Sequence, residues 1–293
     1  MTARRYLSGA GSVPLDPPTS VVWELATRRD DPARRRPVVP GDHLLGTTAC
    51  FELIDDLARI GVDAVEIGGG EPTERADFWA IVDRVRERGM SLAFDTDGTG
   101  ITPAVARRLA GDHRLTARIR LSAATSAADD VVRGAGAYRA SVRAMELLAS
   151  TGDYEFEVTA PLTRHTADHL DALAGVADLF GARLRLTGDR PTDSAPDAGQ
   201  RRALAAWLRA HGGEIRLGPH LTGDLAETCG AGIDTCRIDA TGLVFACPVP
   251  RPAPPVGTIR AKGGFAALWQ QAPLLAHART GGCPAAPAVA RGA

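Results

Sequence analysis

The sequence predicts an α/β protein, a partial (β/α)6 barrel of the TIM type followed by a short C-terminal appendage. Apolar, β-branched segments typical of strands alternate six times with segments of helical periodicity. Parallel neighbouring strands need long crossover connections, and the intervening helices supply them. From about Leu217 onward glycine and proline become frequent, cysteines appear and the helical periodicity fades. These observations predict one barrel and a smaller unit after it.

The predicted elements are short and follow one another closely. The strands cover residues 21–26, 64–67, 91–96, 115–122, 155–159 and 183–187. The helices cover residues 48–60, 77–88, 103–109, 137–150, 166–180 and 197–210. Gly61 and Gly89 each follow a helix and are typical C-terminal caps. Thr102 precedes Pro103, a pair typical of a helix N-terminus.

We expect the chain to divide into three parts. Residues 1–20 contain basic residues but no apolar stretch, so we interpret them as a flexible arm and not as a secretory signal. Residues 21–215 form the barrel. Residues 216–293 form the appendage, in which residues 236–247 alternate like a β-hairpin around Gly242.

The composition argues against several classes of function. A net charge of −1 gives no general attraction to nucleic acid or to anionic membranes. No segment approaches the ~18 consecutive apolar residues of a membrane span. We therefore expect a cytoplasmic protein, in which the five cysteines would be reduced thiols or metal ligands. Lys262 is the only lysine and lies in a glycine-rich turn, which argues against Schiff-base chemistry.

The second predicted strand ends in a glycine-rich turn with a carboxylate: Gly68, Gly69, Gly70 and Glu71, followed by Pro72. Glycine permits either sign of φ and brings backbone amides and carbonyls close to a ligand. Ligands of parallel α/β proteins bind at this C-terminal edge of the sheet. We favour a ligand pocket here, and a structural turn is the alternative.

The sequence around this turn resembles radical S-adenosylmethionine (SAM) enzymes, and among them the maturases of the mycofactocin precursor peptide. The resemblance is carried by residues 68–89 and 94–102, which are similar to the second and third βα units of that family. Residues 132–148 and 162–191 continue it. Residues 229–248 are similar to the opening of a SPASM domain, which carries auxiliary iron–sulfur clusters in the family.

The resemblance implies a SAM site at the C-terminal edge of the sheet. Gly68, Gly69, Gly70 and Glu71 would receive the SAM amino group, because an ammonium needs carbonyl and carboxylate acceptors. Residues of the family at the positions of Thr96, Ser122 and Arg133 contact the SAM ribose and carboxylate. The family usually has asparagine where this chain has Asp97, which adds negative charge.

The chain departs from the family where relatives bind their cluster. The family places a CxxxCxxC loop after the first strand, and its three thiolates hold a [4Fe–4S] cluster. Here those positions are occupied by Arg29, Ala33 and Arg36, and no cysteine precedes Cys50. Cluster iron needs thiolate or occasionally imidazole ligands. We therefore expect no cluster at this loop and weak SAM binding, because the arginines would repel a sulfonium cation.

Arginines are concentrated in the same loop. They are Arg28, Arg29, Arg34, Arg35 and Arg36. Guanidinium groups suit phosphate and carboxylate ligands. Two aspartates partly neutralise the segment, so we favour a solvated loop over an anion site.

Two further groups of residues have the chemistry of metal ligands. Cys229, Cys236, Cys247 and Cys283 could together hold one zinc ion or one iron–sulfur cluster. Small buried residues are the alternative. The CxxC that continues the SPASM pattern is absent, since Cys283 is followed by alanine at the second cysteine position, so we expect a truncated SPASM-like region. His165 and His169 have i,i+4 spacing, but surface or capping roles are favoured, because no third ligand is evident.

These observations leave two classes of function open. The first is a degenerate, non-catalytic relative of the mycofactocin maturases that binds a precursor peptide, an intact maturase or SAM. The second is an enzyme: a peptide maturase with atypical iron–sulfur binding, or a barrel used for non-radical chemistry. The missing cluster ligands favour the first.

Overall fold

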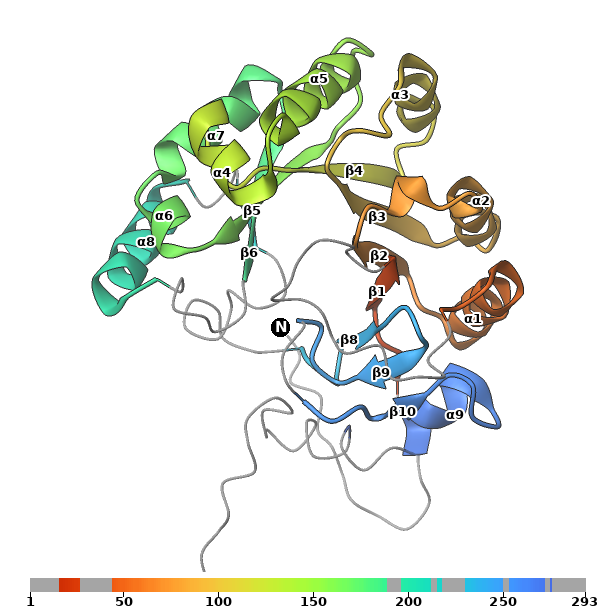
Figure 1. The fold of residues 1–293 in the computed structure, drawn as a ribbon. Helices are drawn as coiled ribbons and strands as arrows, with labels where there is room; N and C mark the ends of the chain where they lie inside the picture. Colours follow the sequence, from red (N-terminus) through yellow and green to blue (C-terminus); the bar gives the residue numbers. More distant parts are fainter. Residues whose placement is uncertain are drawn as a thin grey trace, which may run out of the picture.

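The structure is a computed structural model that describes residues 16–26, 44–188, 196–211, 215–217, 230–249, 253–271 and 275. Its centre is a curved sheet with helices on its outer side (Figure 1). The strand order is β10-β9-β8-β1-β2-β3-β4-β5-β6-β7. All pairs from β8 through β1 to β7 are parallel, and β8-β9 and β9-β10 are antiparallel. The predicted partial barrel with a C-terminal appendage is thus confirmed.

The barrel strands lie close to their predicted positions. They are β1 Ser20–Ala26, β2 Ala64–Gly69, β3 Ser91–Thr96, β4 Leu115–Arg120, β5 Glu157–Leu162 and β6 Arg183–Gly188. The helices that follow them are α1 Thr47–Ile60, α2 Phe78–Glu87, α3 Pro103–Ala110, α5 Ala137–Ala149, α7 Leu170–Leu179 and α8 Ala198–His211. Thr102 caps α3 as predicted, because its side chain accepts a hydrogen bond from the Val105 amide.

Several elements differ from the sequence prediction. The predicted helix over residues 166–180 is two helices, α6 Arg164–Ala167 and α7. A capping box of Thr163 and Thr166 begins α6, and the non-helical residues 168–169 separate it from α7. Two short helical segments were not predicted, the 3-10 turn η1 Pro72–Glu74 and α4 Ser126–Arg133. Helix α4 follows the fourth strand directly, and its eight residues are too few for a clear periodic signal.

The C-terminal appendage continues the barrel sheet. The predicted hairpin is present as β8 Thr235–Ile238 and β9 Leu243–Phe245, and β8 pairs in parallel with β1. Strand β10 Gly257–Thr258 and helix α9 Gly264–Gln271 follow, and β7 Arg216–Leu217 extends the other edge. Sequence analysis missed these last three elements, since two are two-residue strands. The proposed boundaries at residues 20 and 215 remain predictions.

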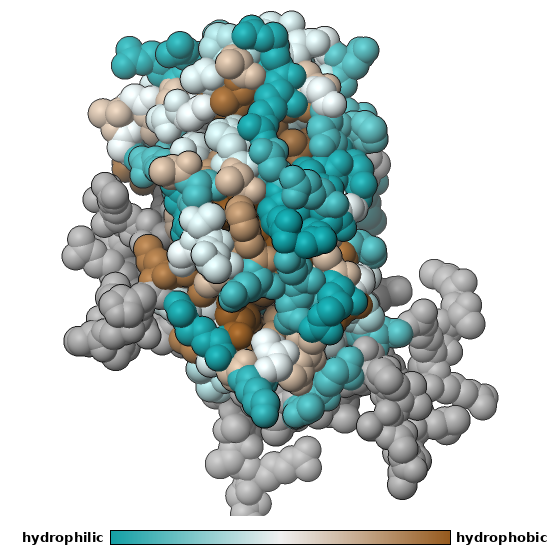
Figure 2. Space-filling view, turned by 90° about the vertical axis from the view of Figure 1, so that its right-hand side faces the viewer, coloured by the Kyte–Doolittle hydropathy of each residue, from teal (hydrophilic) through white to brown (hydrophobic). Residues whose placement is uncertain are grey.

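The two faces of the barrel sheet have opposite character. Alternate strand residues such as Trp23, Ile67 and Phe94 are fully buried and belong to one apolar core together with the inner sides of the helices. This is the two-residue periodicity of a strand. On the outer surface of the molecule, hydrophilic side chains cover much of the side that carries α1 and α2, with apolar residues in small groups between them (Figure 2). In the described part of the chain, no helix is both long and apolar enough to cross a membrane.

The intervening strand residues carry charges that pair across the sheet. Arg118 donates from Nη1 to Glu66 (2.6 Å) and from Nε to Glu157 (2.9 Å). Arg185 donates to Glu66 (3.2 Å). We call Glu66, Arg118, Glu157 and Arg185 the charged cluster. Burial alone would raise the pKa of Glu66, but the Arg118 and Arg185 guanidiniums hold this pKa below its usual range.

The charged cluster predicts a pH-dependent stability. Because the pKa of Glu66 is lower in the folded than in the unfolded chain, its contribution is complete above the unfolded value of roughly 4.3 and is lost as the pH falls through the folded value. Glu66→Gln should therefore cost about 1.5–3 kcal/mol at neutral pH, and the difference from wild type should shrink toward acid pH. Urea unfolding at several pH values measures this. Glu155→Gln, at an exposed pair with Arg183, is the control and should change little.

Candidate functional site

The glycine-rich turn at the end of β2 is locked to the end of β1. Gly69 has φ +99°, and a Cβ there would lie 2.2 Å from the Ala26 carbonyl oxygen, so that only glycine fits. The Gly70 amide donates to the same Ala26 oxygen at 2.8 Å. The turn is therefore a close backbone contact between two strands as well as a candidate ligand site.

Glu71 is bound on every side by groups of the protein. Its Oε1 accepts hydrogen bonds from the Thr73 amide (3.2 Å), the Thr73 hydroxyl (2.6 Å) and the Thr96 hydroxyl (2.9 Å). Its Oε2 accepts from the Asp97 amide at 2.7 Å. The Glu71 side chain is 6% exposed. Burial, and after it the Asp97 carboxylate, raises the pKa of Glu71. This carboxylate joins the ends of β2 and β3.

Arg120, the last residue of β4, reaches the same turn. Its Nη2 donates to the Gly70 carbonyl oxygen at 2.9 Å and lies 3.5 Å from Oε2 of Glu71. The turn carbonyl and the carboxylate that were expected to receive an ammonium thus have a guanidinium beside them. Sequence analysis did not identify Arg120, since an arginine at the end of a strand in an arginine-rich chain gives no distinctive signal.

Ser122 and Arg133 meet through Asp129, which is fully buried in α4. The Asp129 carboxylate accepts from the Ser122 amide (2.6 Å) and from Arg133 Nη1 (3.1 Å). Arg133 also donates to the Ser141 hydroxyl at 3.0 Å and to the Arg120 carbonyl. Burial lowers the pKa of Arg133 below the usual arginine value. Asp129 was missed, although its i,i+4 spacing to Arg133 is a signal for an ion pair.

The structure thus gathers most of the predicted site residues at one edge of the sheet. Gly70, Glu71 and Thr96 are linked by hydrogen bonds through Glu71 and Arg120, whereas Ser122 and Arg133 form a neighbouring network. Gly68 lies beside Asp95, since a Cβ on this glycine would be 3.8 Å from the Asp95 carboxylate. The assignment of these residues as SAM contacts stays a prediction.

Arg75 holds the two ends of the segment where relatives carry their cluster loop. Its Nη1 donates to the Leu25 carbonyl at the end of β1 (3.2 Å), and its Nη2 donates to the Leu45 carbonyl before α1 (3.2 Å). Asp77 fixes the guanidinium through two hydrogen bonds of 2.9 and 2.8 Å. The pKa of Asp77 is lowered to about 2, chiefly by its hydrogen bond from Arg75. Arg29, Ala33 and Arg36 lie outside the described residues.

The cysteines that the structure describes are buried. Cys50 directs its thiol toward the Leu45 carbonyl oxygen at 3.7 Å, and burial raises the pKa of this thiol to about 11. Cys236 and Cys247 are buried in the C-terminal hairpin region. Cys229 and Cys283 lie outside the described residues, so the four-cysteine site stays a prediction. Among the described residues, no three His, Cys, Asp or Glu side chains are grouped as metal ligands.

His165 and His169 lie side by side, with ring centroids 4.7 Å apart. Nδ1 of His169 is 2.8 Å from the His165 carbonyl oxygen, as expected for a local helix-end contact.

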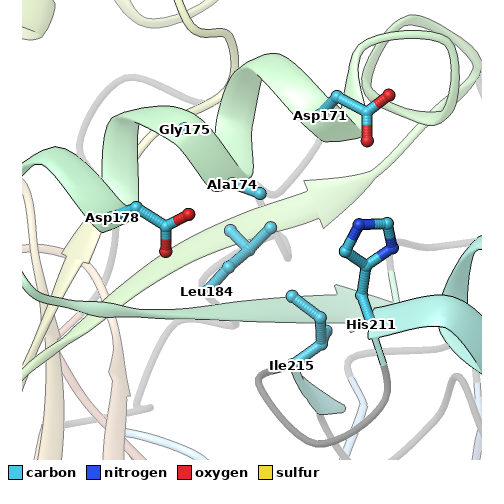
Figure 3. Close-up of a pocket in the computed structure, with 7 residues that line it drawn as sticks. All are labelled: Asp171, Ala174, Gly175, Asp178, Leu184, His211 and Ile215. Carbon is cyan, nitrogen blue, oxygen red and sulfur yellow. The ribbon is translucent and has the colours of Figure 1, made fainter.

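A separate pocket of about 170 Å³ lies between α7 and the end of α8 (Figure 3). It is lined by Asp171, Ala174, Gly175, Asp178, Leu184, His211 and Ile215. Leu184 lies at the beginning of β6 and Ile215 directly precedes β7, away from the strand ends near Glu71.

Comparison with known proteins places the chain in a family. The mycofactocin maturase MftC of Mycobacterium ulcerans is 38% identical over 90% of this chain and 78% of its own length. MftC of Mycolicibacterium smegmatis is 36% identical over 90% of this chain and 73% of its own length. The family model of the radical SAM superfamily matches residues 39–159. The chain belongs to the radical SAM superfamily.

The solved structures agree with this assignment at the level of the fold. SuiB of Streptococcus suis, in its complex with S-adenosylmethionine, superposes with a TM-score of 0.70 at 16% identity. The superposition covers 90% of this chain and 66% of SuiB. The predicted family resemblance is confirmed by the mycofactocin maturases, and the solved structures agree with the predicted fold.

The segment between β1 and α1 does not fit the [4Fe–4S] cluster that the family implies at this position. Residues 1–49 contain no cysteine, so the segment between β1 and α1 offers no thiolate to iron. The nearest thiol, Cys50, is buried at the start of α1 and has a raised pKa, which disfavours the thiolate form.

The Glu71 network predicts a stability effect. Glu71→Gln should lower the free energy of unfolding by about 1–3 kcal/mol. In wild type both carboxylate oxygens accept hydrogen bonds, whereas the glutamine NH2 group would face one of these donors and could not accept from it. Urea denaturation with an unchanged m value would measure this. Glu74→Gln, at an exposed position in the same turn, is the matched control. An equal effect of both substitutions would contradict the described network.

Proposed function

We propose that this chain is a non-catalytic member of the mycofactocin-maturase branch that acts by binding a precursor peptide. The absence of any cysteine from residues 1–49 carries this proposal. Reductive cleavage of SAM needs an electron delivered by a cluster next to the sulfonium. Arginine and alanine side chains cannot ligate iron, and they occupy the positions that correspond to the cluster cysteines.

The retained barrel supports a binding role. The sheet keeps its parallel register, its apolar core and the anchored turn at Glu71, although the cluster ligands are missing. SuiB has been solved bound to its precursor peptide SuiA. A peptide can add to an exposed sheet edge through backbone hydrogen bonds. In the described part of the chain, the sheet order ends at β7 and β10, and these strands are the candidate docking edges.

An active peptide maturase is the second candidate. It is favoured by the 38% identity to MftC, which extends over 90% of this chain. In this case a cluster would have to be held elsewhere, and Cys229, Cys236, Cys247 and Cys283 are the thiols available after α1. In a variant of the binding role, this chain binds an intact maturase instead of a precursor peptide.

The first test is the iron content of the protein. After anaerobic reconstitution with iron and sulfide, we expect no [4Fe–4S] spectrum attributable to the first loop and no cleavage of SAM upon reduction. A variant with Cys229 and Cys247 replaced by alanine distinguishes iron bound by the C-terminal cysteines from iron bound elsewhere, since iron held by these cysteines should be lost. MftC serves as the positive control. Reductive cleavage of SAM by the reconstituted wild-type protein would overturn the non-catalytic proposal, and its loss or persistence in this variant would locate the cluster.

The second test is peptide binding without cofactor. A fluorescently labelled mycofactocin precursor peptide should bind the metal-free protein, with anisotropy rising to saturation, because the proposed binding needs neither cluster nor SAM. A scrambled peptide of the same composition is the control. Equal binding of both peptides, or binding only after cluster reconstitution, would contradict the proposal. An intact maturase added in place of the peptide tests the partner version.

A further inference from the structure

The positively charged group beside the glycine-rich turn is the guanidinium of Arg120. We propose that Arg120 permanently fills the acceptor site that the turn would otherwise offer to the amino group of SAM, so that the site rejects amino-acid ligands. This goes beyond the proposed function, because it concerns ligand recognition at Glu71 and not the cluster.

The acceptors of this site are already used. An ammonium needs carbonyl or carboxylate oxygens, and among the predicted acceptors Arg120 contacts the Gly70 carbonyl and the Glu71 carboxylate. Arg120 Nη2 is 2.9 Å from the Gly70 oxygen and 3.5 Å from Glu71 Oε2. The other Glu71 oxygen accepts three hydrogen bonds from Thr73 and Thr96. A second cation would have to displace the guanidinium to reach either group.

The reach of Arg120 explains why an arginine serves this purpose. Strand β3 lies between β2 and β4 in the sheet, so the turn at Gly70 is two strand spacings, about 10 Å, from the β4 backbone. A long side chain is required to cross that distance. The Arg120 backbone is itself held, because its carbonyl accepts from the Ser141 hydroxyl at 2.9 Å and from Arg133.

The surroundings keep the guanidinium in place. The Arg120 side chain is 18% exposed and that of Glu71 is 6% exposed, so the contact is largely shielded from water. Charge–charge interactions are stronger in such surroundings than at the surface. Arg133 lies near enough to repel Arg120, and its own pairing with Asp129 offsets part of this repulsion.

The experiment compares two probes that differ by the amino-acid group. S-adenosylhomocysteine carries the ammonium and carboxylate but no sulfonium, and adenosine lacks the amino-acid part. Calorimetry on the metal-free wild-type protein should show S-adenosylhomocysteine binding no more tightly than adenosine. In Arg120→Ala and Arg120→Gln the ammonium can reach the freed acceptors. Each variant should then bind S-adenosylhomocysteine at least about tenfold more tightly than adenosine, as expected for one charge-assisted hydrogen bond.

The control is Arg107→Gln, which removes one positive charge at an exposed position of α3 and should behave as wild type. Circular dichroism shows whether each variant is folded. The comparison of S-adenosylhomocysteine with adenosine on the wild-type protein tests the proposal even if a variant does not fold. Wild-type protein that prefers S-adenosylhomocysteine at least tenfold would overturn the proposal. Folded Arg120 variants without this preference would also overturn it. Neither outcome depends on whether a cluster forms, so this proposal can fail while the proposed function holds.

Discussion

The hydrogen bonds to Glu71 are the constraint on which the edge of the barrel depends. Four donors from Thr73, Thr96 and Asp97 converge on one carboxylate, and they come from the turn after β2 and from the end of β3. Arg120 extends this connection to β4. Three consecutive strands therefore end at a fixed point, and the geometry of the candidate site follows from the internal hydrogen bonding of the protein.

A second group of charges stabilises the inner side of the sheet in a different way. The charged cluster places Arg118 between Glu66 and Glu157, and Arg185 also reaches Glu66. Removal of one partner from a buried pair leaves an uncompensated charge, which costs more than the pair contributes. The apolar core on the outer side supplies the driving force for folding, and the charged cluster restricts which strand registers are compatible with paired charges.

Much of the fold was predictable because the barrel strands are apolar on one face and the helices between them have clear caps, such as Thr102 before α3. The same reasoning found Glu71 and Thr96, since both lie at strand ends of one sheet edge. It missed Arg120 and Asp129. Their importance comes from contacts across strands and from a short helix, and no local pattern marks such contacts. It also missed β7 and β10, because a two-residue strand is defined by its partner and not by its own sequence.

The anchoring of Arg75 has a consequence for sequence changes between β1 and α1. The guanidinium fixes the chain at Leu25 and again at Leu45, and Asp77 completes the anchor from the beginning of α2. None of these contacts uses a side chain between the two anchor points. The Arg75 anchor therefore does not depend on which side chains the intervening segment carries, and a change of residues there leaves both attachment points in place. The same two fixed ends make this segment a natural place to graft a cysteine-containing loop.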